Sequence, residues 1–311
     1  MSVAHWDDVD PEVEEVGHLA GVWRDLGSAA GSVTVGVQRI EILAGKWSTP
    51  AHVELGEEEI FFVLRGSGLS WQDGETFEVA SHDCLVHFVE EATHTLNAGP
   101  DGLDVLAFGM RHAVGGTYLP RARVVRMGPG SAAVRVDKHP WEYEAEAGPP
   151  ELPASPSPRP TRIVSLDDVP IVERTNGGDI CRRQRALAAA AGSSLTGLQH
   201  VSVPSGKLNC PPHCHSAEEE LFVVLDGDGV LLLGDEEHGV RPGTVVSRPA
   251  GTGVAHAFRA GAAGLTYLAY GTREPNDIAY YPRSGKISFR GVGLIGRLEP
   301  LDYWDGEEPP G

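Results

Sequence analysis

The chain repeats one segment at an interval of 161 residues (211 − 50). Residues 50–68 read PAHVELGEEEIFFVLRGSG and residues 211–229 read PPHCHSAEEELFVVLDGDG, with 10 of 19 positions identical. Nearly the same interval recurs further along, where LAFG at 106–109 corresponds to LAYG at 268–271. An interval of this length is that of a domain and not that of a short solenoid unit. The sequence therefore predicts two copies of one domain.

A Pro-rich stretch, GPPELPASPSPRP at 148–160, separates the two copies. This composition favours an extended linker, and the alternative is a surface strap packed on one domain. We expect an N-terminal domain over 1–147, this linker, and a C-terminal domain over 161–311. The 311 residues are enough for two domains of ordinary size, each with a hydrophobic core.

Each copy has the pattern of β-structure. Short apolar runs such as IFFVL and LFVVL end at glycine-containing turns, and their length suits strands buried on both faces. Asp73-Gly74 lies between alternating residues in WQDGETFEV, which predicts a hairpin. The alanine-rich segment RALAAAAG at 185–192 is the only convincing helix. Many short strands in each copy predict an all-β barrel or jelly roll.

The formal net charge of −19 argues against several classes of partner. An acidic chain repels phosphate backbones and anionic membrane surfaces, so we expect neither nucleic acid nor membrane as a partner. The sequence has no apolar run of about 18 residues and no apolar core in its acidic first residues, which argues against a membrane span and a signal peptide. Its four cysteines do not resemble a disulfide framework. These features favour a cytoplasmic protein.

The second copy concentrates metal-ligating side chains. His213 and His215 are two residues apart, so on a strand they project to the same side. Glu220 begins the next apolar run, which can fold back beside them, and His256 can complete the set from a further strand. Three imidazoles and one carboxylate suit a transition metal such as Fe, Mn, Ni, Cu or Zn, whereas Mg or Ca would require more oxygen ligands. Such a set leaves a coordination position open for a substrate.

These residues carry a resemblance to the cupins. The segment that contains Gly206, His213, His215, Glu220 and Gly227 resembles the first cupin motif. The segment that contains Gly243, Pro249, Gly251 and His256 resembles the second. The resemblance covers nearly the whole chain because both copies share it. It implies a bicupin: two tandem jelly-roll (double-stranded β-helix) barrels related by duplication, with the metal held by the three histidines and the glutamate.

The first copy keeps three of the four ligand positions. His52, Glu59 and His94 match, while Glu54 stands where the second copy has His215. Two imidazoles and one carboxylate are enough for non-haem iron, so Glu54 is a candidate ligand of a more anionic site. The alternative is a degenerate barrel in which Glu54 is hydrogen-bonded or solvated.

The second motif of the first copy has drifted. His82, Phe88 and Glu90 stand where the second copy has Gly243, Pro249 and Gly251. Those positions shape a turn, so the replacements bear on the backbone and say little about metal ligation. The acidic runs GEEE and AEEE beside the two sites are expected to be solvated turns in which only the last Glu is a ligand.

Further candidates surround the predicted C-terminal site. Glu219 is the next candidate ligand, and Glu218 is a candidate base behind the ligands. Candidates for substrate binding are Arg248, Arg259 and Tyr280. Arg182, Arg183 and Arg185 could also meet an anionic substrate, although most arginines are surface residues. A zinc ribbon through Cys210 and Cys214 is a rival interpretation, but no matching Cys/His pair follows at the required spacing.

The resemblance implies a metal-dependent enzyme. We expect a dioxygenase that acts on a small oxygen-rich organic substrate chelated to Fe(II) in the C-terminal barrel, with Mn, Ni, Cu or Zn as alternative metals. Glu220 is also a candidate base. The alternatives are a metal-dependent isomerase or decarboxylase, and a non-catalytic bicupin that binds a small ligand. Two fused barrels can replace a dimer of single cupins, or the fused chain can form a homodimer in turn.

Overall fold

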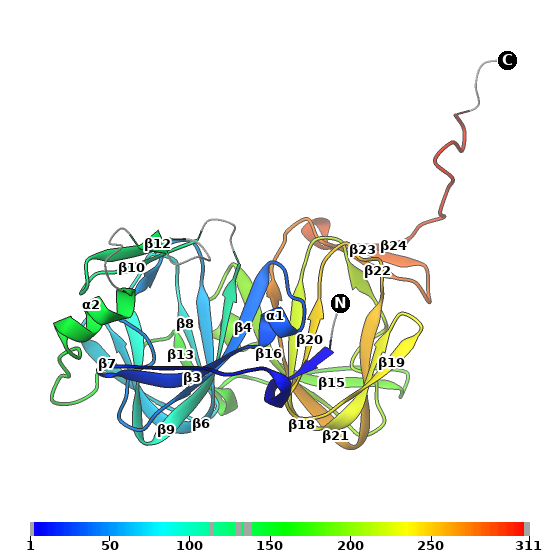
Figure 1. Cartoon of the computed structure of the whole chain (residues 1–311). Helices are drawn as coiled ribbons and strands as arrows, with labels where there is room; N and C mark the ends of the chain where they lie inside the picture. The colour runs from blue at the N-terminus through cyan, green and yellow to red at the C-terminus, as the bar shows by residue number, and fades with distance from the viewer. Residues whose placement is uncertain (1–2, 112–114, 128–131, 134–138, 308–311) are drawn as a thin grey trace.

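The chain folds into two β-barrels that lie side by side (Figure 1). The computed structural model describes residues 3–111, 115–127, 132–133 and 139–307. The α-helices in this part of the chain are short: α1 (Leu26–Ala29), α2 (Pro140–Ala147) and α3 (Leu187–Ala190). The other regular structure is β-sheet with three single turns of 3-10 helix, so the predicted all-β fold of two tandem barrels is confirmed.

The N-terminal barrel is built from an eight-stranded sheet and a four-stranded sheet. The large sheet has the order β13-β8-β6-β9-β4-β3-β2 with β7 paired to β6, and the small sheet has the order β12-β11-β10-β5. The strands of the large sheet are β2 (Glu12–Val16), β3 (Leu19–Asp25), β4 (Val35–Ile42), β6 (Glu59–Gln72), β7 (Glu75–Ala80), β8 (Asp83–His87), β9 (His94–Met110) and β13 (Ile163–Ser165). Those of the small sheet are β5 (Val53–Glu54), β10 (Gly116–Leu119), β11 (Val124–Met127) and β12 (Ala132–Ala133).

The C-terminal barrel repeats this plan. Its large sheet has the order β1-β20-β18-β21-β16-β15-β14 with β19 paired to β18, and its small sheet has the order β17-β22-β23-β24. The strands of the large sheet are β1 (Val3–His5), β14 (Val172–Asn176), β15 (Ile180–Arg185), β16 (Thr196–Val203), β18 (Glu220–Leu233), β19 (Glu236–Val240), β20 (Thr244–Arg248) and β21 (His256–Thr272). Those of the small sheet are β17 (Cys214–His215), β22 (Ile278–Tyr281), β23 (Lys286–Phe289) and β24 (Leu294–Arg297).

The apolar run at the start of β6 explains how the two barrels pack. Successive side chains of a strand point to opposite faces. Phe61 and Val63 lie in the core of their own barrel, whereas Ile60 and Phe62 lie in a second core shared by both barrels. Across that shared core, the rings of Phe108 and Tyr270 lie 5.1 Å apart. A strand that is buried on both faces therefore reads as a continuous apolar run, as the sequence predicts.

Glycine is required where the long strands β6 and β18 change their register. A Cβ atom on Gly66 would lie 2.3 Å from the carbonyl oxygen of Gly102, and one on Gly227 would lie 2.2 Å from that of Gly264. Both strands shift register against their β9 or β21 partner at these positions. The duplicated glycines thus allow the same bend in each barrel.

The drifted motif of the N-terminal barrel keeps its backbone shape. His82 has φ 72° and Glu90 has φ 53°, and the glycines at the matching positions, Gly243 and Gly251, have φ 89° and φ 69°. A non-glycine residue in this left-handed region costs about 1–2 kcal/mol. The turn is therefore preserved at some cost in stability, and the replacements leave the path of the chain intact.

The two barrels exchange a strand across the predicted domain boundary. β1 pairs with β20, placing Val3 opposite Val246 in the C-terminal barrel. β13 pairs with β8, placing Ile163 opposite Leu85 in the N-terminal barrel. The domain limits 1–147 and 161–311 stay a prediction, but neither segment holds all strands of its own barrel. Local sequence could not reveal this exchange because it depends on pairing between distant segments.

The predicted linker at 148–160 is a strap on the N-terminal barrel. The backbone N–H of Ser157 donates to the carbonyl of Thr76 at 2.8 Å, and Nε of Arg159 donates to the carbonyl of Glu78 at 3.0 Å. These bonds attach the strap to β7. The structure therefore favours the packed strap over an extended free linker.

Each barrel sends one buried glutamate into the other barrel. Glu219 accepts hydrogen bonds from the backbone N–H of Val33 at 2.9 Å and of Thr34 at 2.6 Å. At the matching position, Glu58 accepts a hydrogen bond from the hydroxyl of Ser193 at 2.7 Å. The prediction that both acidic runs are solvated turns is wrong at these positions, because Glu58 and Glu219 are 2% exposed. The carboxylate of Glu219 points into the other barrel and accepts these hydrogen bonds, so it is not a candidate metal ligand.

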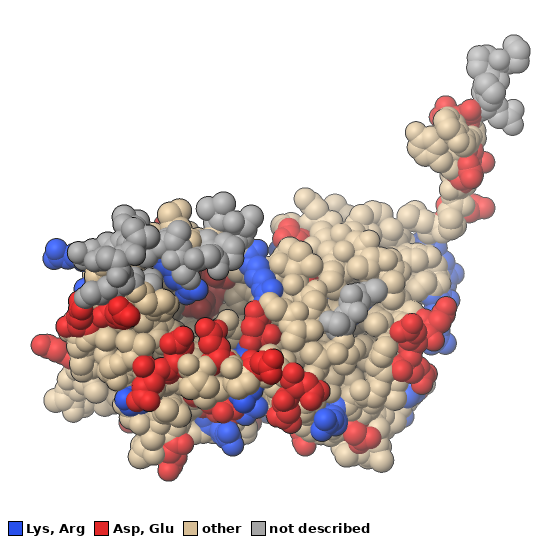
Figure 2. Space-filling view, viewed as in Figure 1, with Lys and Arg blue, Asp and Glu red and all other residues tan. Residues whose placement is uncertain are grey.

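The expectation of a single helical segment is partly wrong. The alanine-rich segment forms α3, as predicted. The longer helix α2 was not predicted from the sequence pattern. No helix in the described part of the chain has the length and apolar character needed to cross a membrane. Acidic side chains form several separate patches on the face shown in Figure 2, one of them where the two barrels meet.

Candidate metal centres

The four predicted ligands of the C-terminal barrel converge. His213 precedes β17, His215 lies in β17, and Glu220 and His256 begin β18 and β21. Oε2 of Glu220 lies 3.0 Å from Nε2 of His256 and 3.5 Å from Nε2 of His215. The ring centroid of His213 lies 4.9 Å from those of both other imidazoles. The carboxylate meets His215 from the other sheet of the barrel, because β17 lies in the small sheet and β18 in the large one. The predicted folding of β18 back beside β17 is therefore wrong, although the predicted side chains do converge.

Hydrogen bonds orient the imidazoles of this cluster. Nδ1 of His213 donates to the carbonyl of Pro211 at 3.0 Å, and Nδ1 of His215 donates to Oδ2 of Asp277 at 2.7 Å. Asp277 is 1% exposed, and its other oxygen accepts the backbone N–H of Ala217 at 3.0 Å. A proton held at Nδ1 leaves Nε2 as the donor atom, which is the arrangement found in histidine metal ligands.

A divalent transition metal fits this cluster. Nε2 of His215 is buried and, within the described residues, has no hydrogen-bond partner. Burial and the neighbouring His256 lower the pKa of His213 to about 4, so its imidazole is neutral. Burial raises the pKa of Glu220, but the hydrogen bond from His256 and the charges of the imidazoles outweigh it and hold that pKa below its usual range. Imidazole nitrogens around an ionised carboxylate form a transition-metal donor set.

The lowered pKa of Glu220 also bears on its second predicted role, that of a base. A carboxyl group with a lowered pKa stays ionised, which suits a ligand and makes it a weak base. The base role of Glu220 stays a prediction, as does its role as a ligand.

In the N-terminal barrel, His52, Glu59 and His94 converge in the matching way. Oε2 of Glu59 lies 2.8 Å from Nε2 of His94 and 3.2 Å from Nε2 of His52. Oε1 of Glu54 lies 3.6 Å from Nε2 of His52, and its carboxylate accepts a hydrogen bond from the hydroxyl of Thr117 at 3.1 Å. Glu54 is thus near the imidazoles and also hydrogen-bonded, so both alternatives for this residue stay open at this point.

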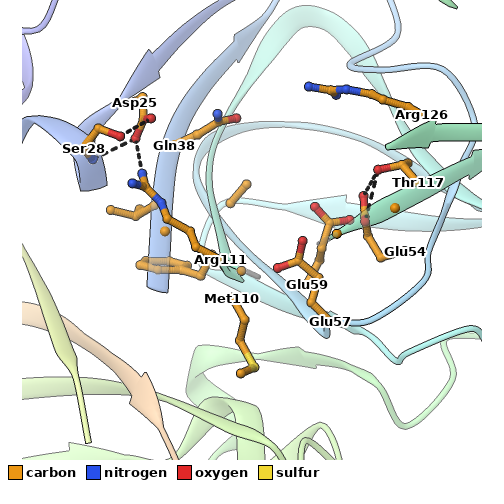
Figure 3. A pocket seen from close by; sticks show the side chains of 17 residues that line it. Asp25, Ser28, Gln38, Glu54, Glu57, Glu59, Met110, Arg111, Thr117 and Arg126 are labelled. Atoms are coloured by element: carbon orange, nitrogen blue, oxygen red, sulfur yellow. Dashed lines mark hydrogen bonds and ion pairs between the residues drawn. The ribbon is translucent and has the colours of Figure 1, made fainter. Parts of the chain in front are cut away.

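Three carboxylates gather on one side of a cavity of about 510 Å³ in this barrel. Figure 3 shows Glu54, Glu57 and Glu59 grouped there, with Arg111 turned away from them. The guanidinium of Arg111 donates to the carboxylate of Asp25 at 2.8 Å. The N-terminal cavity is therefore more acidic than the predicted ligand positions alone suggest.

Comparison with known proteins supports the fold. Residues 199–266 match the family model described as Cupin domain. An oxalate decarboxylase from Lactobacillus farciminis, solved as a formate complex, has a TM-score of 0.60 at 14% identity and covers 88% of this chain and 86% of its own. The chain therefore has the bicupin fold of two tandem barrels, and its C-terminal copy holds the segment that matches the Cupin domain.

Two structures of oxalate decarboxylase from Bacillus subtilis are similar in the same way. A deletion mutant and a structure described by its Mn(II) centres each have a TM-score of 0.59 at 14% identity. Each covers 87% of this chain and 76% of its own. None of the curated proteins compared with this bicupin matches it.

The donors of the C-terminal barrel open into a cavity of about 250 Å³. Arg182 from β15, Arg273 after β21 and Arg290 from a 3-10 helix line this cavity together with the metal donors. Nε of Arg182 is buried and lacks a hydrogen-bond partner among the residues that the structure describes. The cavity thus combines a metal donor set with cationic side chains.

The three residues predicted to bind substrate are not in the wall of this cavity. Arg248 is buried, and its guanidinium donates to the carbonyl of Val254 in the following loop. Arg259 donates to the carboxylate of Asp179 at 3.3 Å on the outer surface. Both arginines were chosen for closeness in sequence to His256. Strand alternation turns Arg259 outward, whereas Arg248 stands opposite Glu220 in the strand register but is bonded to the loop at Val254.

The tyrosine that faces the metal donors is one residue away from Tyr280, which the sequence suggested as a substrate contact. The side chain of Tyr280 is 40% exposed, whereas the ring of Tyr281 stacks on the ring of His213 at 5.5 Å with an interplanar angle of 21°. Neighbouring residues of β22 face opposite sides. Tyr281 is therefore the tyrosine that contacts the candidate metal centre of the bicupin.

Glu218 lies in the cavity wall, as a candidate base should. Its carboxylate pairs with the guanidinium of Arg290 and accepts the backbone N–H of Glu274 at 3.0 Å. Burial raises the pKa of Glu218 to about 7, although the charge of Arg290 opposes this. Its role as a base stays a prediction.

The zinc-ribbon interpretation finds no support at the cysteines. Burial raises the pKa of Cys210 to about 12. Sγ of Cys210 lies 3.7 Å from Nδ1 of His213, on the side opposite the donor atom Nε2. Cys214 contacts the carbonyl of Tyr280. Both cysteines are free.

Sequence reasoning missed Asp277, Arg290 and the acidic side chain of Glu57. Asp277 lies 62 residues after His215, and no spacing rule connects the two. The only signal is indirect, because Asp277 precedes β22, and β22 pairs with the strand that carries His215. That pairing becomes visible only in the folded barrel.

Proposed function

We propose that the C-terminal barrel is a metal-dependent enzyme site for a small carboxylate substrate, and that its reaction is a decarboxylation. The observation that supports this proposal best is the position of Arg182. Its partly unpaired guanidinium lines the same cavity as His213, His215, Glu220 and His256. A guanidinium binds a carboxylate through two parallel N–H donors, which recognises its shape as well as its charge.

The size and polarity of the cavity favour a small anion. A volume of about 250 Å³ is smaller than the roughly 300–1,000 Å³ of pockets that bind drug-sized ligands. Three arginines and the amide side chains of Gln199 and Asn209 line it. Bulky apolar substrates, such as flavonols, would leave the buried Nε of Arg182 without a partner, which is costly in a buried site. A short mono- or dicarboxylate would supply that partner.

The similar structures point in the same direction. Both the Lactobacillus farciminis and the Bacillus subtilis proteins are oxalate decarboxylases, and the first was solved with formate. The dioxygenase reaction expected from the sequence has no comparable support, whereas the alternative of a decarboxylase has. Mn(II), which the Bacillus subtilis structure contains, joins Fe(II) as a metal for this site.

Each group of the site has a separate part in this proposal. His213, His215, Glu220 and His256 would hold the metal, which supplies positive charge that draws electrons from the substrate. Arg182 binds and orients the carboxylate. Asp277 keeps the proton of His215 on Nδ1, and Tyr281 covers the face of His213 and limits access of water to that side.

The proposal is tested by measuring two gases at once. The full chain, loaded with Mn(II) or Fe(II), is incubated with a panel of ¹³C-labelled short mono- and dicarboxylates, and labelled CO₂ and dissolved oxygen are recorded. We expect CO₂ release without stoichiometric oxygen uptake. Oxygen uptake that matches substrate loss would restore the dioxygenase, and inactivity of a metal-loaded chain toward the whole panel would contradict an enzyme of this class.

Arg182→Ala tests how the substrate is bound. Loss of a charge-assisted bidentate contact costs about 1.5–3 kcal/mol, which corresponds to about a 10- to 100-fold lower kcat/KM. Arg183→Ala is the matched control, because Arg183 is exposed and pairs with Glu173 at 2.8 Å on the outside of the barrel. Equal effects of the two substitutions would remove Arg182 from the proposed site.

A further inference from the structure

The end of the chain repeats the segment that forms α2. Residues 139–143 read HPWEY and residues 299–303 read EPLDY, at an interval of 160 residues (300 − 140). Pro140 and Tyr143 thus recur as Pro300 and Tyr303. A pair of prolines follows each segment at the same interval, at 149–150 and 309–310. The duplication therefore extends beyond the last strand of each barrel.

In the N-terminal barrel, this segment packs on the barrel to which it belongs. The rings of Trp141 and Trp23 lie 5.3 Å apart, and Tyr143 is 8% exposed. A Cβ atom on Gly17, in the turn between β2 and β3, would lie 3.0 Å from Cβ of Ala145. The helix α2 thus covers the hairpin of β2 and β3.

A buried ion pair holds α2 in this place. The guanidinium of Arg121, which follows β10, lies 2.9 Å from the carboxylate of Glu144, and Glu144 is fully buried. Nη2 of Arg121 also donates to the carbonyl of Ala147, the last residue of α2, at 3.4 Å. A cation that binds both a carboxylate and the carbonyl end of a helix fixes the position of that helix.

The C-terminal barrel has the matching surface without this cover. Every residue of β14 is exposed and none of β15 is fully buried, whereas β3 is mostly buried. A Cβ atom on Gly177 or Gly178, in the turn between β14 and β15, would have no atom of the described residues within 4 Å. Arg283 ends the segment YYPR after β22, as Arg121 ends YLPR after β10, and Arg283 is exposed.

The repeated segment at the end of the chain lies away from this surface. Figure 1 shows the chain after β24 leading outward from both barrels. Leu301 is 69% exposed and Tyr303 is 84% exposed, and the neighbouring Trp304 is exposed as well. Full burial of one such side chain stabilises a protein by about 1.5–3 kcal/mol. An apolar surface that receives these side chains would therefore bind the segment.

The connections that lead to the two segments have similar lengths. Ala133 in β12 and Ile295 in β24 occupy matching positions in the registers of the two small sheets. Pro140 follows Ala133 by seven residues (140 − 133), and Pro300 follows Ile295 by five (300 − 295). A connection of this kind brings α2 to its own barrel, which favours the same chain over a second copy as the docking partner.

We propose that the surface formed by β14, β15 and Arg283 binds residues 298–307 of the same chain. Leu301 and Tyr303 pack on the hairpin of β14 and β15, as the matching residues of α2 pack on β2 and β3. Asp305, the first carboxylate after Tyr303, pairs with Arg283. The C-terminal barrel then acquires the cover that α2 gives the N-terminal barrel.

Docking at this surface has a consequence for the C-terminal cavity. In the N-terminal barrel, Trp141 of α2 lines a cavity of about 140 Å³ together with His52 and Glu59. Among the described residues that line the C-terminal cavity, none comes from 298–307, although Arg182 of β15 does line it. We expect the docked segment to close this side and to limit entry of the substrate. This consequence rests on the proposed function, whereas the docking itself does not.

Pairs of cysteines test the docking in the full chain. Arg283→Cys/Asp305→Cys is compared with Glu237→Cys/Asp305→Cys, since Glu237 is exposed on β19 of the same barrel. Both pairs carry Cys181→Ser, which removes the one native cysteine that is partly exposed. The first pair should form a disulfide within one chain at least about tenfold faster than the second, because docking raises the local concentration of the two thiols. Equal rates, or disulfide-linked dimers in place of linked monomers, would overturn the proposal.

A further substitution identifies the contact that drives docking. In the first cysteine pair, Tyr303→Asp should slow disulfide formation to the rate of the control pair, because a carboxylate opposes burial on the hairpin. Val292→Asp is the matched change, since Val292 is 76% exposed outside the segment, and it should leave the rate unaltered. An unchanged rate in Tyr303→Asp would overturn the proposed packing.

The linked chain also separates the docking from the proposed reaction. Disulfide formation is measured without substrate, so a failure of the decarboxylation leaves the docking test intact. If wild type releases CO₂, the linked chain should release it at least about tenfold more slowly, and a reductant should restore the rate. An unchanged rate in a fully linked chain would remove the segment from the entrance of the cavity.

Discussion

Where the C-terminal barrel has His215 bonded to Asp277, the N-terminal barrel has Glu54 bonded to Thr117. Gly115 stands at the position that corresponds to Asp277, two residues before the partner of β5 or β17. An aspartate that orients a histidine has no such role when the histidine is absent. The residue at this candidate ligand position and its hydrogen-bond partner therefore differ together between the two barrels.

The largest expected difference between the barrels is in activity. His213→Ala should weaken metal binding in the C-terminal barrel by more than about 100-fold and abolish turnover, because it removes a donor directly. His52→Ala should leave turnover within about twofold of wild type. Metal per chain by elemental analysis and CO₂ release measure the two effects. Equal loss of activity in both variants would mean that the barrels act as one catalytic unit.

A smaller effect is expected at Asp277. Asp277→Ala should weaken metal binding in the C-terminal barrel about 10- to 100-fold, because His215 loses the bond that holds its proton on Nδ1. Competition with a chelator of known affinity measures this change. Thr117→Val is the matched change in the other barrel and should leave the C-terminal site unaltered. An Asp277→Ala chain with wild-type affinity would show that packing alone orients His215.

The glutamates that cross between the barrels should differ in their contribution to stability. Glu219 accepts three bonds from Val33 and Thr34 at 2.6 to 2.9 Å, while two of the bonds that Glu58 accepts are longer, at 3.3 and 3.4 Å. Glu219→Ala should lower the free energy of unfolding by about 3 kcal/mol and Glu58→Ala by about 1–2 kcal/mol. Chemical denaturation measures both.

An exposed glutamate supplies the control for that comparison. Glu237→Ala, on the surface of β19, should change stability by less than about 0.5 kcal/mol. If Glu58→Ala proved more costly than Glu219→Ala, the lengths of these bonds would not govern the strength of the interface.

The smallest expected difference concerns pH. His200 in β16 stands where the N-terminal barrel has Arg39, which is bonded to Asp104 at 2.8 Å. Burial, with the charges of Arg185 and His82, lowers the pKa of His200 to about 4. The unfolded chain then binds more protons than the folded chain, so stability falls as pH decreases from about 6.5 toward about 4.

His200→Gln removes this pH-dependent cost. Between pH 7 and pH 5, the loss of unfolding free energy should be about 1–2 kcal/mol smaller in His200→Gln than in wild type. Denaturant titrations at the two pH values measure the difference. An identical loss in both chains would show that His200 is protonated equally in the folded and unfolded states.

Several features of the fold and the site follow from local sequence. The repeat predicts two barrels, and Asp73-Gly74 predicts the turn between β6 and β7, which pair at Gln72 and Glu75. The pattern His-x-His followed by Glu predicts that His213, His215 and Glu220 meet. These predictions succeed because strand alternation and tight turns are properties of a few neighbouring residues.

Other features depend on contacts between distant segments. The exchange of β1 and β13 between barrels, the pairing of Asp277 with His215, and the position of Arg182 in the cavity wall have no local signal. The prediction of Arg248, Arg259 and Tyr280 failed for the same reason. Closeness in sequence to a ligand says nothing about which face of a strand points into the cavity.

The acidic run of the first copy is an example in which sequence determines one property and tertiary structure another. Sequence by itself determined that three consecutive glutamates, Glu57, Glu58 and Glu59, precede a buried strand. Tertiary structure alone decided that Glu57 lines the cavity, that Glu58 binds the other barrel and that Glu59 faces the imidazoles. The three side chains are chemically identical, so their roles follow from direction, and direction is set by the sheet and by the neighbouring barrel.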